Sequence, residues 1–374
     1  MTRFISLLFT ALLVGFAALA HAGFDEGKAA YHKGDFAKAY EEFKTVAEQE
    51  NAEAQNYLGM MYESDQGVPQ DYAEAVKWYR KAAEQGHACA QANLGAMYEN
   101  GQGVPKDYAE ALKWFRESAE QGDAHGQNRL GVMYESGQGV PQDYAEAVKW
   151  YRKAAEQGHD SAQANLGVMY ATGQGVPKDY AEALKWYRKA AEQGHTVAQF
   201  SMGTAYAIGQ GVPKDSTEAV KWFRKAAEQG HTVAQFNLAV AYDVGHGVQR
   251  DYAEALKWYR KSAEKGNANA QHNLGNIYSK GQCVPKDSAE AVKWYRMAAE
   301  QGDAYAQSNL GVTYANGAGV PQDYVLAHMW FNLAARQGYP SAEDHRDTLA
   351  KKMTPAQIAE AQRLAREWKP KSEK

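Results

Sequence analysis

The pattern in this sequence that comes nearest to a catalytic motif is Ser262-Ala263-Glu264-Lys265, an S-x-x-K in which a serine could attack an acyl group. The S-D-N and K-T-G signatures that accompany this motif in β-lactam-processing enzymes are absent from the sequence. Equivalent positions elsewhere carry other small residues, Ala190 and Ser118, which indicates a position that faces a neighbouring helix. We therefore predict that Ser262 is not a nucleophile and that the protein is not an enzyme.

Four histidines could suggest a metal site, since each follows a glycine at an equivalent place in the chain: His87, His159, His195 and His231. Packed helices lie roughly 8–10 Å apart, too far for imidazoles of successive units to share a zinc ion at about 2 Å. Elsewhere the same place holds Asp123, Asn267 or Asp303, which are helix-capping residue types. The pattern predicts caps, with no metal.

Glycine-rich loops of the type GQGVPKD recur along the chain and could suggest phosphate binding through backbone amides. They lack the remaining residues of a P-loop, so we interpret them as connectors and expect no cofactor. The two cysteines, Cys89 and Cys283, are far apart in the sequence and are predicted to remain unpaired.

These residues recur because the chain is internally repeated. From Ala54 to Ser341 the sequence divides into eight 36-residue units without insertion or deletion: 54–89, 90–125, 126–161, 162–197, 198–233, 234–269, 270–305 and 306–341. One tryptophan marks the same position in every unit: Trp78, Trp114, Trp150, Trp186, Trp222, Trp258, Trp294 and Trp330.

Each unit is predicted to contain two antiparallel helices. In the fourth unit Leu166, Met169 and Tyr170 follow helical spacing, whereas Gly167 occupies a position where glycine costs about 1 kcal/mol relative to alanine. Glycine occurs there in every unit except the sixth, which has Ala239. We infer that a neighbouring backbone passes too close to this position for a side chain.

The second helix of the fourth unit is predicted to begin at Asp179, with Glu182 completing a capping box, and to end at Gly194. Its expected buried stripe consists of Ala183, Trp186, Tyr187 and Ala190.

The motif AQxxLGxxYxxGxGVPxDxxxAxxWxxxAAxxG resembles the Sel-one-like repeat (SLR) family, whose units are relatives of the tetratricopeptide repeat. The resemblance implies an all-α fold, an α/α superhelical solenoid with a concave face, and a role as an adaptor or scaffold. Residues 23–53 resemble a tetratricopeptide-like hairpin and are expected to cap the N-terminal end. Residues 342–374 are expected to form C-terminal capping helices, the last starting at Thr354 with Gln357 as capping partner.

Some disulfide-bonded members of this family are associated with β-lactam binding and slow hydrolysis. The present chain lacks their cysteine pairs in each repeat, which weakens that inference. A hydrolase or binding protein acting on cell-wall or β-lactam chemistry is therefore kept as an alternative. A structural, self-associating oligomer is the other alternative.

Residues 1–22 have a positive charge at Arg3, an apolar run and a small-x-small site at Ala20-His21-Ala22. This pattern predicts a signal peptide cleaved after Ala22, which would place the protein in the periplasm or outside the cell. No second apolar segment is long enough to cross a membrane, so no stable span is expected after cleavage. The formal net charge of -4 gives no support to nucleic-acid binding.

By resemblance to tetratricopeptide arrays, five positions in each unit line the concave face: the last residue of the preceding unit and residues three, seven, ten and eleven of the first helix. The acidic members are Glu63, Glu99 and Glu135, which we expect to steer a basic partner segment. The apolar members are Val197, Phe200, Ile208, Val233, Phe236, Val240 and Val244, and His272 follows them.

An uncovered apolar surface usually marks an interaction site, so these residues predict a protein or peptide partner for an otherwise monomeric protein. A second interpretation is that Phe200 and Phe236 pack between neighbouring first helices as additional core. The sequence leaves both interpretations open.

Overall fold

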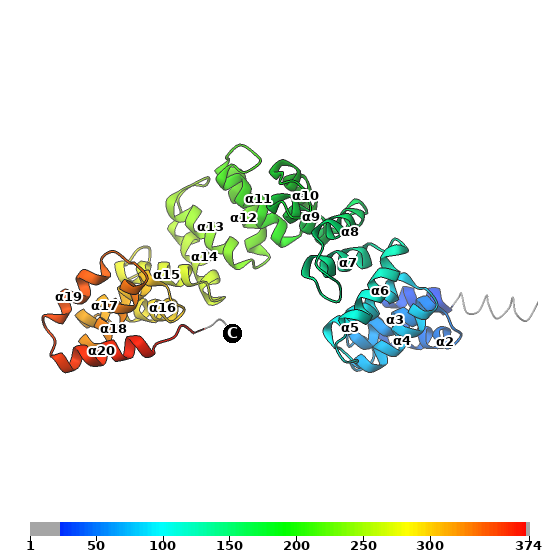
Figure 1. The fold of residues 1–374 in the computed structure, drawn as a ribbon, viewed down its shortest axis with the longest axis horizontal. Helices are drawn as coiled ribbons and strands as arrows, with labels where there is room; N and C mark the ends of the chain where they lie inside the picture. Colours follow the sequence, from blue (N-terminus) through cyan, green and yellow to red (C-terminus); the bar gives the residue numbers. More distant parts are fainter. Residues whose placement is uncertain (1–22, 372–374) are drawn as a thin grey trace, which may run out of the picture. The chain divides into compact units, whose positions relative to one another are not determined.

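The computed structural model describes residues 23–371, and the predicted signal peptide lies outside them. Throughout the described residues the regular secondary structure is helical (Figure 1). Residues 23–32 form a helix, followed by α2 (Phe36–Ala47), which packs on the first helix of the array. The prediction of an all-α solenoid is confirmed.

Each repeat contributes a first helix and a second helix that pack against each other. The first helices are α3 (Ala52–Glu63), α5 (Ala88–Asn100), α7 (Ala124–Ser136), α9 (Asp160–Thr172), α11 (Thr196–Ile208), α13 (Thr232–Val244), α15 (Ala268–Lys280) and α17 (Ala304–Asn316). The second helices are α4 (Tyr72–Glu84), α6 (Tyr108–Glu120), α8 (Tyr144–Glu156), α10 (Tyr180–Glu192), α12 (Ser216–Glu228), α14 (Tyr252–Glu264), α16 (Ser288–Glu300) and α18 (Tyr324–Arg336).

The chain divides into two compact units, one up to Gln193 and one from Gly194 onward, each holding four repeats. The second unit also contains α19 (Ala342–Ala350) and α20 (Pro355–Glu367), and both pack on α18 (Figure 1). The rings of Trp330 and Trp368 meet edge to face, with centroids 6.2 Å apart. The helices at this end therefore cover the last repeat of the second unit.

The hydrophobic core lies between successive repeats as well as within them. One cluster joins Ala83 of α4, Leu94 and Met97 of α5, and Trp114 of α6, all of which are buried. The repeated tryptophan thus belongs to a core that includes the second helix of the preceding repeat. Trp186, which belongs to the predicted buried stripe of the fourth repeat, is only half-buried.

In every repeat except the sixth, the glycine in the middle of the first helix faces an aromatic ring. A Cβ atom built on Gly167 would lie 2.6 Å from Cδ1 of Tyr187 on the second helix of the same repeat. The inference of a close backbone was therefore wrong, because a side-chain ring fills this space. Gly59 and Tyr79, Gly95 and Phe115, Gly131 and Tyr151, and Gly275 and Tyr295 form equivalent pairs.

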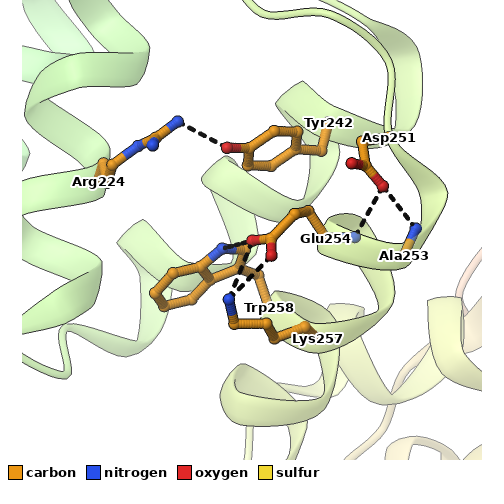
Figure 2. Close-up of polar contacts among 7 residues, drawn as sticks. All are labelled: Arg224, Tyr242, Asp251, Ala253, Glu254, Lys257 and Trp258. Atoms are coloured by element: carbon orange, nitrogen blue, oxygen red, sulfur yellow. Dashed lines mark hydrogen bonds and ion pairs between the residues drawn. The ribbon is translucent and has the colours of Figure 1, made fainter.

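The aspartate caps are confirmed, but the capping box predicted at the second helices does not form. Asp251 accepts hydrogen bonds from the backbone N–H groups of Ala253 and Glu254 (Figure 2). Glu254 instead accepts hydrogen bonds from Nε1 of Trp258 at 3.1 Å and from Lys257 at 2.9 Å. Glu182 does the same with Trp186 and Lys185. A capping box does form where it was predicted at Thr354 and Gln357.

Arginine–tyrosine hydrogen bonds tie six of the second helices to the first helix that follows in the same compact unit. The guanidinium of Arg224 on α12 donates to the hydroxyl of Tyr242 on α13 at 2.6 Å (Figure 2). The same bond recurs 36 residues apart, in the pairs Arg80–Tyr98, Arg116–Tyr134, Arg152–Tyr170, Arg260–Tyr278 and Arg296–Tyr314.

A ladder of glutamines, which the sequence analysis missed, crosses the repeat boundaries. It pairs a buried glutamine on the first helix with a glutamine nearer the surface at the end of the second helix. Gln91 Nε2 donates to the carbonyl of Ala83 at 3.2 Å, and Gln121 Nε2 donates to Gln91 Oε1 at 2.6 Å. The corresponding side-chain bonds join Gln85 to Gln55, Gln157 to Gln127, Gln193 to Gln163, Gln229 to Gln199, Gln301 to Gln271 and Gln337 to Gln307. These bonds satisfy buried polar groups that would otherwise be costly.

The ladder is interrupted where Lys265 replaces glutamine. Lys265 Nζ donates to the carbonyl of Gly230 at 2.7 Å, and the buried Oε1 of Gln235 has no hydrogen-bond partner among the described residues. Replacing Lys265 by glutamine is therefore expected to raise the free energy of unfolding by about 1 kcal/mol, as measured by urea denaturation. Lys214→Gln, in an exposed loop, is the control and should have no effect. Equal stability of Lys265→Gln and the parent would contradict the role given to the ladder.

Cys283 occupies a backbone conformation that favours glycine. Its φ is 53°, and the other repeats have glycine at this position. The Sγ of Cys283 lies 3.5 Å from the carbonyl oxygen of Tyr252, the atom that a Cβ would crowd in the other repeats. Because left-handed backbone is strained for residues with a Cβ, Cys283→Gly is expected to stabilise the protein by about 1 kcal/mol in chemical denaturation. Cys89→Ser, which copies Ser161, should leave stability unchanged, and a destabilised Cys283→Gly protein would refute the strain argument.

Candidate partner-binding face

The positions predicted to line a concave face lie on the first helices. Neighbouring first helices contact each other in both compact units: α5 contacts α7 in the first unit, and α15 contacts α17 in the second. We call this surface the first-helix face. On it, apolar side chains are exposed in repeats five and six: Val197, Ile208, Val233 and Val244 are 51%, 62%, 42% and 56% exposed.

The three predicted acidic residues already have partners within the fold. Glu63 accepts a hydrogen bond from the hydroxyl of Tyr79 at 2.6 Å, and Glu135 accepts one from Tyr151. Burial, assisted by these carboxylates, raises the pKa of both tyrosines, so the phenols stay neutral and donate their protons to the hydrogen bonds. Glu99 is buried and forms an ion pair with Arg129, which compensates its charge. Electrostatic steering, which remains a prediction, is therefore better assigned to Glu63 and Glu135 than to Glu99.

A groove of about 360 Å³ opens between α11 and α13, with the start of α12 as its floor. We call it the apolar groove. Its rim includes the exposed Ile208 and Val244, and Phe236 and Val240 form one wall. The remaining lining residues are Thr204, Ala207, Ser216, Ala219, Val220, Phe223, Asn237, Ala241 and His246.

The two phenylalanines that the sequence left undecided have different surroundings. Both are half-buried and pack against the core of the second unit. Phe236 also lines the apolar groove, whereas Phe200 does not. Phe200 stacks on the imidazole of His231, with ring centroids 4.5 Å apart. Phe236 is therefore the better candidate for contact with a partner.

Beside the apolar groove, repeat five lacks a polar pair that repeats one, three and six contain. In repeat one, Tyr79 bonds to Glu63, and in repeat six Tyr259 bonds to Asp243 at 3.2 Å. Repeat five has Phe223 and Ala207 at these two positions, so neither position supplies a hydroxyl or a carboxylate to the groove.

An equivalent groove of about 280 Å³ lies two repeats further on, between α15 and α17. We call it the polar groove. Lys280 stands where the apolar groove has Ile208, and Tyr295 where it has Phe223. The predicted residue His272 lies beside this groove: Asn276, which lines the groove, is hydrogen-bonded to its Nε2 at 3.2 Å. Burial lowers the pKa of His272, opposed by the charge of Asp303 and assisted by that of Lys280, which favours the neutral ring.

The recurring histidines cap helices, as predicted. The Nδ1 atom of His87 accepts a hydrogen bond from the backbone N–H of Ala90 at 3.2 Å, and His159, His195 and His231 cap α9, α11 and α13 in the same way. Asp123, Asn267 and Asp303 are caps in other repeats. A capping Nδ1 must be unprotonated, so the proton of the neutral ring sits on Nε2.

These caps predict a pH dependence of stability. Burial lowers the pKa of His87 in the folded protein. The contribution of His87 to the free energy of unfolding is therefore fully present above the unfolded pKa of about 6.5 and is lost as the pH falls through the folded pKa. We expect His87→Asn, which copies the Asn267 cap, to keep stability at neutral pH and to lose less of it on acidification than the parent. Melting temperatures measured from neutral to mildly acidic pH test this, and parallel curves would disprove it.

The S-x-x-K motif is not arranged for acyl chemistry. The side chain of Ser262 is buried, and its hydroxyl donates to the carbonyl of Thr232 at 2.8 Å. Lys265 binds the carbonyl of Gly230 instead of the serine. Ser262 is thus the helix-facing small residue that the sequence predicted, like the buried Ser118.

Comparison with known protein families gives eight successive matches. The profile of the Sel1 repeat matches residues 52–87, 90–123, 124–159, 160–195, 196–231, 232–267, 268–303 and 304–339, which is most of the chain. The chain belongs to the Sel1 repeat family. Sel1 repeats generally serve as protein-interaction scaffolds.

Two crystal structures of Sel1 repeat proteins are similar to this chain. The first is c5321, described as a protective antigen of uropathogenic Escherichia coli strains with an SLR fold. It is 35% identical, with a TM-score of 0.61, and the match covers 96% of this chain and 94% of c5321. A Sel1 repeat protein from Oxalobacter formigenes is also 35% identical, with a TM-score of 0.59 over 83% of this chain and 89% of that protein. No match is found among curated proteins.

Two further observations concern residues 23–371 only. None of their helices combines the length and the apolar character that crossing a membrane requires. Within the same residues, no three histidine, cysteine or acidic side chains are grouped so that they could hold a metal ion.

Proposed function

We propose that this Sel1 repeat protein is a non-catalytic scaffold that binds a protein or peptide through its first-helix face, in the periplasm or outside the cell. The observation that carries the proposal is the apolar groove. It exposes Ile208 and Val244 to solvent at positions where other repeats have polar residues such as Asn100, Lys280 and Asn316. Exposing these side chains has no benefit for folding, and apolar surface of this kind commonly marks interaction sites.

Two observations support a location outside the cytoplasm. The N-terminal sequence has the pattern of a cleaved signal peptide. The similar protein c5321 is described as a protective antigen. Edman sequencing of the exported protein is expected to begin at Gly23.

Selection of peptides by display on the purified mature protein tests the binding function. We expect the selected peptides to carry apolar anchors and to lose affinity for the double variant Ile208→Lys, Val244→Asn. Both substitutions copy residues at equivalent positions, Lys280 and Asn316, so the fold should be preserved. Met297→Lys, which copies Lys261 on a second helix, is the matched control and should bind normally. Peptides that bind parent and double variant equally would refute the proposal.

Self-association through the apolar groove is an alternative that the same double variant tests. If the apolar groove held a second copy of the chain, light scattering would show a dimer that the double variant abolishes. We expect a monomer whose mass does not depend on concentration.

A further inference from the structure

The apolar groove and the polar groove belong to the same compact unit and are built from equivalent residues. The first lies on α11 and α13 and the second on α15 and α17, two repeats apart. Ala207, Ile208 and Phe223 of the first correspond to Ser279, Lys280 and Tyr295 of the second. The second unit therefore carries the apolar groove and, two repeats further along, the polar groove.

The polar groove carries uncompensated positive charge. Lys280 and Lys286 both line it, both are exposed, and neither forms an ion pair with any residue that the structure describes. In repeats two and four the lysine equivalent to Lys286 lies over a tyrosine ring, as Lys106 does over Tyr108 at 4.7 Å. Repeat seven has Ser288 in place of that tyrosine, which leaves the ammonium group of Lys286 without this contact.

The spacing of the grooves fits one extended chain. If successive first helices are taken to lie about 8–10 Å apart, the spacing of packed helices, two repeats correspond to roughly 16–20 Å. An extended peptide advances about 3.3–3.6 Å per residue and would cover this distance in about five or six residues. Side chains of one short segment can therefore occupy both grooves.

We propose that the two grooves bind a single extended peptide whose leucine-like or aromatic side chains enter the apolar groove and whose aspartate or glutamate, about five or six residues away, binds Lys280 and Lys286. This inference rests on the proposed function and specifies its ligand. The apolar anchors supply most of the affinity, and the acidic residue fixes the register through charge complementarity.

Synthetic fluorescent peptides test the proposal by anisotropy. The probe has two leucines and, about five residues away, two glutamates, with serine and glycine elsewhere, and it is made in both chain directions. A second peptide has glutamine in place of glutamate, and a third has the glutamates next to the leucines. The glutamate probe, in whichever chain direction binds better, is expected to bind the parent about tenfold more tightly at low salt than the second and third peptides do.

The double variant Lys280→Asn, Lys286→Gln copies Asn316 and Gln322, so its fold should persist. It should remove the preference for glutamate and leave the affinity for the glutamine peptide unchanged. Lys178→Gln, the equivalent change in repeat four, should change neither affinity.

Equal affinity of the parent for the glutamate and glutamine peptides would overturn the proposal. The proposal would also fail if Lys280→Asn, Lys286→Gln lowered the affinity for both peptides equally. Both results leave the proposed function standing if Ile208→Lys, Val244→Asn still abolishes binding of the displayed peptides. Insensitivity of those peptides to the apolar variant would instead refute the proposed function itself.

Discussion

Replacement of Trp258 by alanine is expected to lower the free energy of unfolding by about 3–5 kcal/mol, the range found when large buried aromatic side chains are removed. Trp258 is 6% exposed and belongs to the cluster that joins Phe223 and Leu238 of neighbouring helices. Its loss would leave a cavity between two repeats and remove the Nε1 hydrogen bond to Glu254 (Figure 2). In an array stabilised by contacts between neighbours, no distant packing can compensate.

Urea denaturation followed by circular dichroism measures this effect. Met297→Ala is a suitable control, because Met297 is 40% exposed and surface substitutions usually change stability by about 0.5 kcal/mol or less. A loss at Trp258 no greater than at Met297 would contradict the role assigned to the repeated tryptophan.

Replacement of Phe236 by alanine is expected to weaken partner binding by roughly 2 kcal/mol or more, about thirtyfold in Kd, while changing folding stability less. Phe236 forms a wall of the apolar groove and is half-buried there, so a partner that fills the groove would complete its burial. Buried aromatic anchors of this kind dominate interface energetics.

Isothermal titration with a selected peptide gives the affinity, and a melting curve gives the stability of the same variant. Ser308→Ala is the matched control, because Ser308 occupies the equivalent position in repeat eight. A sharply lower melting temperature with unchanged affinity would show that Phe236 is core, which is the second interpretation of the sequence.

Much of the fold was predictable because it depends on local signals repeated eight times. Aspartate, asparagine and histidine caps act within three residues of themselves, as at His87 and Ala90, so sequence spacing is sufficient to find them. The glutamine ladder was missed because its bonds between side chains join residues 30 apart, such as Gln91 and Gln121. A signal was nevertheless present, since a glutamine recurs at one position of the first helix in every repeat, after alanine in all repeats except the third, which has Gly126.

The sequence by itself determined the helices, the repeat length, the family and the positions at which repeats diverge, because all of these follow from periodicity. Only the tertiary structure decided what those divergent side chains do. Ile208 becomes the rim of a groove because Ala207, Phe223 and residues of the following repeat leave space beside it. The charge of Glu99 is compensated because Arg129 of the next repeat forms an ion pair with it. Exposure and pairing depend on the volumes and charges of side chains brought together from different repeats, and a pattern within one repeat does not contain that information.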